Sequence, residues 1–261
     1  MGYYIHTTQG NQMAFNNTGS VHYDGIANEK QTIETLNRLG IYSDPVTHKG
    51  GTQSKADAVA GSLSISIKQK KTGISVGSFD WVNTTRVPAP IAQKFENFIA
   101  AVKQLRTLNE SQRLEAKDDL RDFFNQTGSE SFDALTTSDL VSFLRQTFAK
   151  QDGFDVVITD SKAGNLYHFS AVAHPAIRLI AEGYIPTFAP ATKAGQTSRT
   201  LVFTKGNDSV RCGLRLRIVS NNGIGAFLGL GANRSSSVVF KLQQDNVPAL
   251  LEATGATCYS I

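Results

Sequence analysis

The sequence has only two cysteines, Cys212 and Cys258, among its 261 residues. Two cysteines are too few for a disulfide framework or a zinc site, so we expect free thiols in a reducing compartment. No apolar run approaches the length of about 20 residues that a bilayer requires. The N-terminal residues also lack a basic stretch followed by an apolar core, as a secretory signal would have. These absences predict a cytoplasmic protein without a membrane segment.

Several catalytic signatures are missing as well. The five histidines are scattered and show neither HxH nor HExxH spacing, which excludes the common histidine metal sites. There is no GxSxG nucleophile elbow. Lys49-Gly50-Gly51 lacks the rest of a phosphate-binding loop, and the glycines of residues 221–231 lack the βαβ setting of a dinucleotide site. Hydrolases of the serine type, P-loop proteins and nicotinamide enzymes are therefore disfavoured.

The composition is that of a folded protein, with 40% hydrophobic and 18% charged residues. The net charge of +4 and the sequence pI of about 9.0 weakly favour a polyanionic partner. The nearest candidate for a domain boundary is residues 86–90, but the strands before it are too few for a stable domain. We therefore expect a single domain over residues 1–261.

The most informative stretch is residues 54–71, SKADAVAGSLSISIKQKK. Gly61-Ser62 separates two runs of strand-forming residues, and glycine at the first central position suits a type II′ hairpin turn. This turn places Asp57 opposite Ser66, and strand alternation puts Lys68 on the same face. Small and apolar residues occupy the other face and are expected in the core: Ala58, Ala60, Leu63, Ile65 and Ile67. A carboxylate, a hydroxyl and an ammonium group thus converge. This arrangement of three side chains can hold a metal ion and orient a water.

A helix is predicted over residues 26–39, with Gly40 as its C-terminal cap. Glu29 lies in its first turn, where the helix dipole favours a carboxylate. Its alternative role is that of an acid pointing from the helix toward the hairpin. Residues 1–24 are expected to form a loop or arm, and residues 43–53 a loop.

The rest of the chain predicts a helical block followed by strands. Helical spacing of apolar residues indicates a block at about 91–150. Beyond it, we expect strands at 154–159, 166–172, 201–204, 210–219 and 237–243, and short helices at 175–181 and 248–253. Residues 185–200 are basic and irregular, and we expect a mobile recognition loop there. The fold class is therefore α+β, with a central mixed β-sheet flanked by helices.

Basic residues gather in two places. Lys70 and Lys71 follow the hairpin, with Arg86 shortly after; such a cluster is either a solvated rim or a set of phosphate contacts. In the segment VRCGLRLRIV, alternation places Arg211, Arg215 and Arg217 on one face and Cys212 in the core. The arginines repel one another unless an anion lies opposite, so we favour a surface that lies along DNA over an exposed face with carboxylate partners. We add Asn221 and Asn222 to these expected DNA contacts.

The pattern Asp57…Ser66-x-Lys68 resembles the PD-(D/E)xK nuclease motif, in which an acid precedes a (D/E)-x-K triplet on the adjacent strand. The order of helix and hairpin is also similar, and within that superfamily the chain most resembles small type II restriction endonucleases. The late strand that contains Phe240-Lys241 also resembles a strand with a Phe-Lys pair in the C-terminal part of those enzymes. Two positions differ: Ala56 replaces the proline, and Ser66 replaces the second acid. The resemblance covers roughly residues 25–86.

This resemblance implies a restriction-endonuclease-like fold and a Mg²⁺-dependent endonuclease that hydrolyses double-stranded DNA, with a homodimer left open. Asp57, the Ile67 carbonyl and Glu29 would hold the metal, Lys68 would act on the attacking water, and Ser66 would assist by hydrogen bonding. Asp80 is the other candidate for the missing acid. One alternative is a catalytically inactive DNA-binding protein on the same scaffold, and a weaker one is a protein whose partner is another protein.

Overall fold

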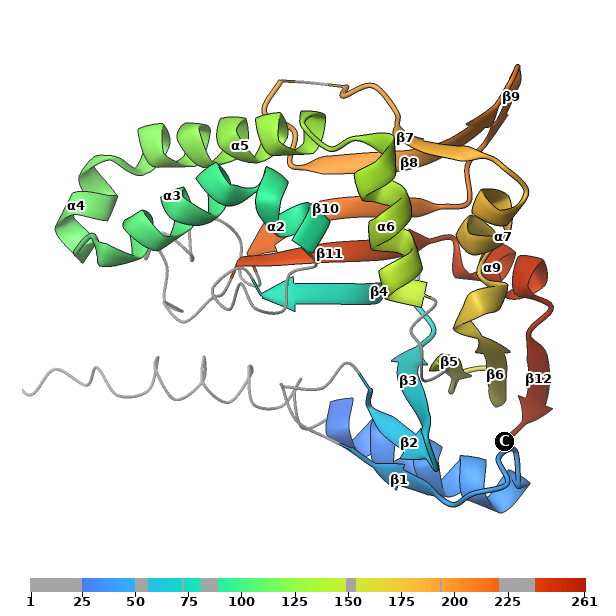
Figure 1. Cartoon of the computed structure of the whole chain (residues 1–261). Coiled ribbons are helices and arrows are strands. Elements are labelled where there is room, and N and C mark those ends of the chain that lie inside the picture. The colour runs from blue at the N-terminus through green and yellow to red at the C-terminus, as the bar shows by residue number, and fades with distance from the viewer. Residues whose placement is uncertain are drawn as a thin grey trace, which may run out of the picture.

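The computed structural model describes residues 25–49, 56–71, 73–80, 89–148, 154–192, 194–220 and 238–261. These residues form two β-sheets with helices around them (Figure 1). The α+β class predicted from the sequence is confirmed. The strands nevertheless divide between two sheets where a single central sheet was expected, because the chain leaves the first sheet directly after the hairpin and pairs with late strands.

The first sheet is mixed. Its strands lie in the order β1-β2-β3-β5-β6-β12. Only β3 and β5 run parallel, and the other neighbours are antiparallel. The bounds are β1 (Val46–His48), β2 (Ala58–Ala60), β3 (Leu63–Gln69), β5 (Phe154–Asp160), β6 (Asn165–Ser170) and β12 (Thr257–Ser260).

The second sheet is antiparallel throughout. Its strands lie in the order β4-β11-β10-β8-β7, and β9 also pairs with β8. The bounds are β4 (Gly73–Asp80), β7 (Ile185–Phe188), β8 (Ser198–Lys205), β9 (Asp208–Val210), β10 (Leu214–Ser220) and β11 (Val238–Asp245). Because β4 follows β3 after only a short link, the two sheets are joined at the end of the hairpin.

The helices cover both sheets. The helix of residues 25–39 (blue) lies below the first sheet, and α5 and α6 (green) lie against the second (Figure 1). The remaining bounds are α2 (Ala89–Lys94), α3 (Glu96–Thr107), α4 (Glu110–Glu115), α5 (Lys117–Asp133), α6 (Thr137–Phe148), the 3₁₀ turn η2 (Ala171–Ala173), α7 (Pro175–Ala181) and α9 (Val247–Thr254). Within the described part of the chain, no helix has the length and apolarity needed to span a membrane.

The β5 strand of the first sheet is buried on both faces. Val157 packs with Ile33 and Leu36 of the first helix in one apolar cluster. Its neighbours Val156 and Ile158 point the other way, into a larger cluster shared with the helices and the second sheet. This double burial explains why β5 reads as a continuous apolar run rather than as an alternating one.

Most predicted elements are present. The first helix, the helical block, both short helices and the strands around residues 154–170 are confirmed. Gly40 caps the first helix with φ +60°, and the Ile41 N–H donates to the Leu36 carbonyl. The predicted arm at residues 1–24 lies outside the described residues.

Three predictions about the loops and strands were wrong. Residues 43–53 contain β1, which is too short to show a period. Residues 185–200 contain β7 and the start of β8 rather than only irregular chain. The strand predicted at 210–219 is interrupted, because Gly213 adopts φ +78° and β10 begins after it. Strands β4 and β12 were not predicted.

Replacement of Phe240 by alanine is expected to cost about 3–5 kcal/mol of unfolding free energy. Phe240 is fully buried, and its ring lies 5.8 Å from that of Phe95 and 5.7 Å from that of Phe143. Phe123→Ala is the matched control, because Phe123 is 50% exposed and its loss should cost less than about 1 kcal/mol. Urea unfolding of both variants measures the difference, and equal losses would contradict the assignment of the core.

His174 predicts a pH-dependent loss of stability. Burial is the main cause that lowers its pKa to about 4, and Arg178 adds to the effect. Its Nδ1 accepts from the Ala176 N–H, so the proton sits on Nε2, which donates to Gln244. The unfolded chain takes up a proton below about pH 6.5, whereas the folded chain does not until about pH 4. Stability should therefore fall by roughly 3 kcal/mol as pH drops through this window.

The measurement is urea unfolding at several pH values for wild type and His174→Asn. Asparagine can still cap α7 through its side chain but does not titrate. The difference between the two proteins should change across pH 6.5–4 and stay constant above that range. A constant difference throughout would show that His174 does not carry the effect.

Candidate active site

The hairpin has the predicted register. Ala58 pairs with Ile65, and Ala60 pairs with Leu63. Gly61 has φ +56° and Ser62 has a negative φ, as a type II′ turn requires. An added Cβ at Gly61 would lie 2.5 Å from the Asp44 carboxylate, so glycine is needed there for space as well.

One carboxylate oxygen of Asp57 organises the polar face of the hairpin. Asp57 Oδ2 accepts from the backbone N–H of Ile67 at 2.7 Å, from Lys68 Nζ at 3.0 Å and from Ser66 Oγ at 3.2 Å. The Oδ1 atom accepts no hydrogen bond from the described residues. Three donors on one oxygen fix the carboxylate group and leave the second oxygen available for a ligand.

Lys68 lies between two oxygens. Its Nζ donates to Asp57 Oδ2 and, at 3.1 Å, to the Ile67 carbonyl oxygen. The Lys68 side chain is 27% exposed and that of Asp57 is 22% exposed, whereas Ser66 is buried. The structure thus brings Asp57, Ser66 and Lys68 together as predicted, at a position that water can reach.

A second lysine–carboxylate pair lies further along the same strands. Lys70 Nζ is 2.7 Å from Asp160 Oδ2 and 5.6 Å from the centre of the Tyr167 ring. The hydrogen bond to Asp160 raises the pKa of Lys70, and the bond from Lys70 lowers the pKa of Asp160. Lys70 is therefore already paired, while Lys71, the other lysine predicted to contact DNA, is exposed.

Glu29 does not join this group. Its Oε2 lies 3.0 Å from His48 Nε2. His48 is paired in register with Ala58, whose side chain is buried in the cluster formed with the first helix. Because neighbouring residues of a strand point to opposite faces, Asp57 projects away from that helix. Glu29 and Asp57 consequently lie on opposite faces of the first sheet.

Asp80 ends β4 in the second sheet, where its backbone pairs with Val239. At the usual rise per strand residue, the strand carries Asp80 about 23 Å from Gly73. The side chain of Asp80 lies outside the described part of the structure, so its prediction as the missing acid stays a prediction. The predicted DNA contacts Arg86, Asn221 and Asn222 lie outside the described residues.

The described residues contain no cluster of three histidine, cysteine, aspartate or glutamate side chains able to hold a metal ion. Mg²⁺ requires less than such a cluster, because it commonly binds through one or two carboxylates, substrate phosphates and water. Asp57 Oδ2 and the Ile67 carbonyl already converge on one cationic group, the Lys68 ammonium. The second carboxylate oxygen of Asp57, Oδ1, and the Ile67 carbonyl oxygen are hard donors of the kind that Mg²⁺ prefers, so these residues fit the ion.

The arginine strand is partly neutralised. Arg215 forms an ion pair with Asp245 on β11, and Arg217 donates to Gln243 at 2.7 Å. Arg211 lies before β10, so the prediction that it continues the same strand face was wrong. Cys212 is only partly buried, and burial raises its pKa to about 11, so its thiol stays protonated.

Lys241 is a cation that the sequence reasoning missed. It faces Arg217 directly across the β10–β11 pair. Burial, and then the charge of Arg217, lowers the pKa of Lys241. The alternation in VVFKLQQD was the available signal, since it places Lys241 on the polar face once β11 and β10 are paired. Like charges opposite one another are unfavourable unless an anion lies near.

A histidine–aspartate pair was also missed. His168 Nε2 lies 2.6 Å from Asp155 Oδ2, and the Tyr42 hydroxyl donates to the same oxygen at 3.3 Å. Burial, and then Asp155, raises the pKa of Tyr42, so the phenol stays protonated. The group links the segment after the first helix to β5 and β6, which is a structural role.

Comparison with protein-family models, curated proteins and solved structures finds no match to the chain. The residues and their geometry therefore carry the functional argument.

Asp57→Ala is expected to lower the unfolding free energy by about 1–3 kcal/mol, because the Ile67 N–H and the Lys68 ammonium lose their acceptor. Asp57→Asn keeps an acceptor oxygen and should cost less. Asp122→Ala, on the exposed surface of α5, is the control and should change stability by less than about 0.5 kcal/mol. Chemical denaturation compares the three variants, and indistinguishable values would show that the carboxylate does not organise the hairpin.

Proposed function

We propose that the protein is a Mg²⁺-dependent endonuclease that hydrolyses phosphodiester bonds in double-stranded DNA. The observation that carries the proposal is that Asp57 Oδ2 and the Ile67 carbonyl oxygen both lie within 3.1 Å of Lys68 Nζ, at an accessible position on one hairpin face. Carboxylate and ammonium groups at this spacing are suited to binding a divalent ion and orienting a water beside a phosphate.

The surrounding elements support the same proposal. An acid at the start of one strand and an x-x-Lys triplet on the next are the arrangement of the PD-(D/E)xK motif. The hairpin belongs to a mixed sheet with a helix on one face and a helical block elsewhere, which is also what that resemblance implies. Type II restriction endonucleases are the group that we favour within it.

Each residue of the hairpin has a role in the proposed reaction. The Asp57 carboxylate and the Ile67 carbonyl would hold the ion, which when bound would lower the pKa of water and offset negative charge on the phosphate. Lys68 orients the attacking water and stabilises the negative charge that develops on the oxygens of the reacting phosphate. Ser66 donates its hydroxyl hydrogen bond to Asp57 and so holds the carboxylate in place. Because Ser66 is buried, we give it no contact with the substrate.

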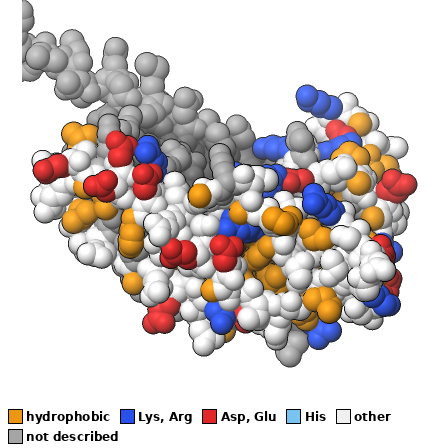
Figure 2. All heavy atoms as spheres, turned by 90° about the horizontal axis from the view of Figure 1, so that it is seen from above, with side chains coloured by type: hydrophobic (Ala, Val, Ile, Leu, Met, Phe, Trp, Pro, Cys, Tyr) orange, Lys and Arg blue, Asp and Glu red, His pale blue; other side chains and the backbone are white. Residues whose placement is uncertain are grey.

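The charges of the surface favour one side for DNA. Figure 2 shows acidic side chains gathered over the α4–α5 end of the face seen from above. Asp118, Asp119 and Asp122 of α5 are exposed and would repel phosphates. Arg217 and Lys241, which face each other across β10 and β11 in the second sheet, would attract them. We therefore assign the DNA backbone to Arg217, Lys241 and the exposed Lys71.

The test is incubation of plasmid and phage DNA with the protein and Mg²⁺. Wild type should give discrete fragments. Asp57→Asn and Lys68→Met should each lose activity by about 100-fold or more, since each removes a group acting at the reacting phosphate. Lys162→Met is the control, because Lys162 is exposed on the β5–β6 turn, and it should cut like wild type. Equal cutting by all four proteins would reveal a contaminating nuclease and overturn the proposal.

A specific feature favours one alternative, an inactive DNA-binding protein on the same scaffold. Ser66 stands where the resemblance calls for a second acid, and a hydroxyl is a weaker ligand than a carboxylate. Salt-sensitive DNA binding without cleavage under any divalent metal would select this alternative. Failure to bind DNA at low salt, where phosphate contacts are strongest, would exclude both the endonuclease and the inactive DNA-binding protein.

A further inference from the structure

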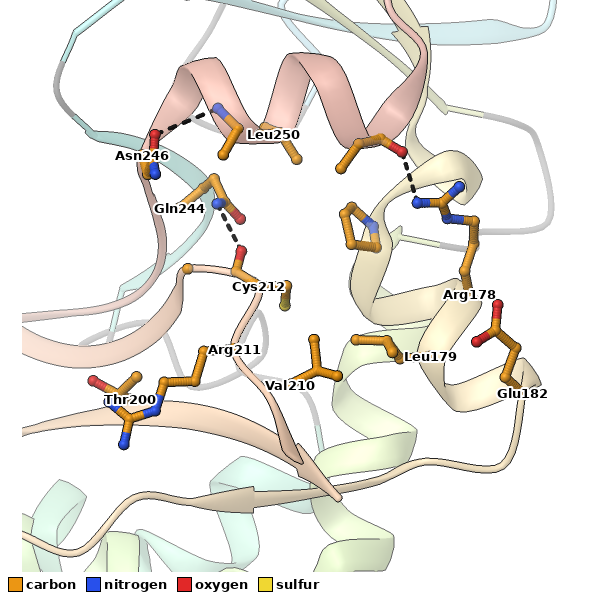
Figure 3. Close-up of a pocket in the computed structure, with 14 residues that line it drawn as sticks. Arg178, Leu179, Glu182, Thr200, Val210, Arg211, Cys212, Gln244, Asn246 and Leu250 are labelled. Atoms are coloured by element: carbon orange, nitrogen blue, oxygen red, sulfur yellow. Dashed lines mark hydrogen bonds between the residues drawn. The ribbon is translucent and has the colours of Figure 1, made fainter. Parts of the chain in front are cut away.

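A pocket of about 600 Å³ lies away from the hairpin, between α7, α9 and the strands around the β9–β10 link (Figure 3). This volume is in the range of sites that enclose small organic molecules. None of its lining residues belongs to the proposed nuclease site.

The middle of the pocket is apolar. Leu179 projects from α7, Leu250 from α9 and Val210 from the end of β9 (Figure 3). Pro175 and Ala249 extend the same lining. Such walls exclude water and favour the apolar body of a ligand.

The frame around the pocket is held by hydrogen bonds. Gln244 is 1% exposed; its Oε1 bonds to His174, and its Nε2 donates to the carbonyls of Cys212 and Asp245. Arg178 donates to the Ala253 carbonyl at 2.7 Å and so ties α7 to α9 (Figure 3). The pocket is therefore formed before a ligand arrives, which reduces the cost of binding.

Charged side chains lie on both sides of the rim. Arg211 and Thr200 line the strand side, whereas Arg178 of α7 and Glu182, which caps the C-terminus of α7, line the helix side (Figure 3). Arg211 has no hydrogen bond or ion pair with the described residues. Its guanidinium group is thus available to an anion, whereas Arg178 on the helix side already donates to the Ala253 carbonyl. Burial raises the pKa of Cys212 to about 11, so its thiol stays protonated and adds no charge to the pocket.

We propose that this pocket binds a small amphipathic carboxylate. Its apolar body lies among Leu179, Val210 and Leu250, and its carboxylate accepts hydrogen bonds from Arg211 and Thr200. Arginine suits this role because its planar group can donate two parallel hydrogen bonds to one carboxylate.

The experiment uses the full chain, without DNA or metal, and 4-phenylbutyrate as the probe. Titration calorimetry should give a Kd of about 1 mM or tighter. Amide chemical shifts, followed by NMR, should change around the pocket. The matched compound 4-phenylbutanamide has the same apolar body without the charge and should bind about tenfold more weakly.

Three variants separate the contributions. Arg211→Gln should weaken 4-phenylbutyrate binding about tenfold and leave 4-phenylbutanamide almost unchanged. Arg145→Gln, on the exposed face of α6, is the matched control and should bind like wild type. Ala249→Trp should fill the pocket and abolish binding of both compounds.

Equal affinity for the acid and the amide would overturn the proposal. Shifts confined to other parts of the chain, or no binding at about 10 mM probe, a concentration well above the expected Kd, would also overturn it. Because DNA cleavage is not part of the readout, this result stands or fails independently of the nuclease proposal.

Discussion

The hydrogen bonds to Asp57 Oδ2 are the constraint on which the candidate site depends. This oxygen takes the place of a backbone acceptor for the Ile67 N–H, and so it extends the β2–β3 pairing with a side chain. The same oxygen holds the Lys68 ammonium beside the Ile67 carbonyl. A single carboxylate therefore fixes the end of the hairpin and concentrates opposite charges at an accessible point.

The rigidity of this point comes from the sheet behind it. The hairpin packs on the first helix through Ala58, Ile65 and Ile67, while β5 is buried on both of its faces. Burial of a polar side chain in such a sheet costs free energy unless the side chain reaches water or a hydrogen-bonding partner. Asp57 and Lys68 meet this condition, and so does the Lys70–Asp160 pair beside them.

The two candidate sites use cations in different ways. At the hairpin, Lys68 is held by two oxygens and its side chain is 27% exposed, as the proposed cleavage of DNA requires. At the pocket, Arg211 has an apolar cavity next to it, which suits a small molecule rather than a polymer. The second sheet connects them, because β4 continues from the hairpin, while β10 begins at the pocket rim. A ligand in the pocket would thus contact the sheet that presents Arg217 and Lys241.

The sequence by itself determined the elements with strong local signals: the first helix with its glycine cap, the helical block and the Gly61-Ser62 hairpin. Strand alternation placed Asp57, Ser66 and Lys68 on one face, because the turn fixes the register between neighbouring strands. Tertiary structure alone decided which distant strands pair. It separated Glu29 from Asp57 across the sheet, gave Arg215 its partner Asp245 and placed Lys241 beside Arg217. These outcomes depend on long-range pairing and on the face that each helix covers, and local spacing encodes neither.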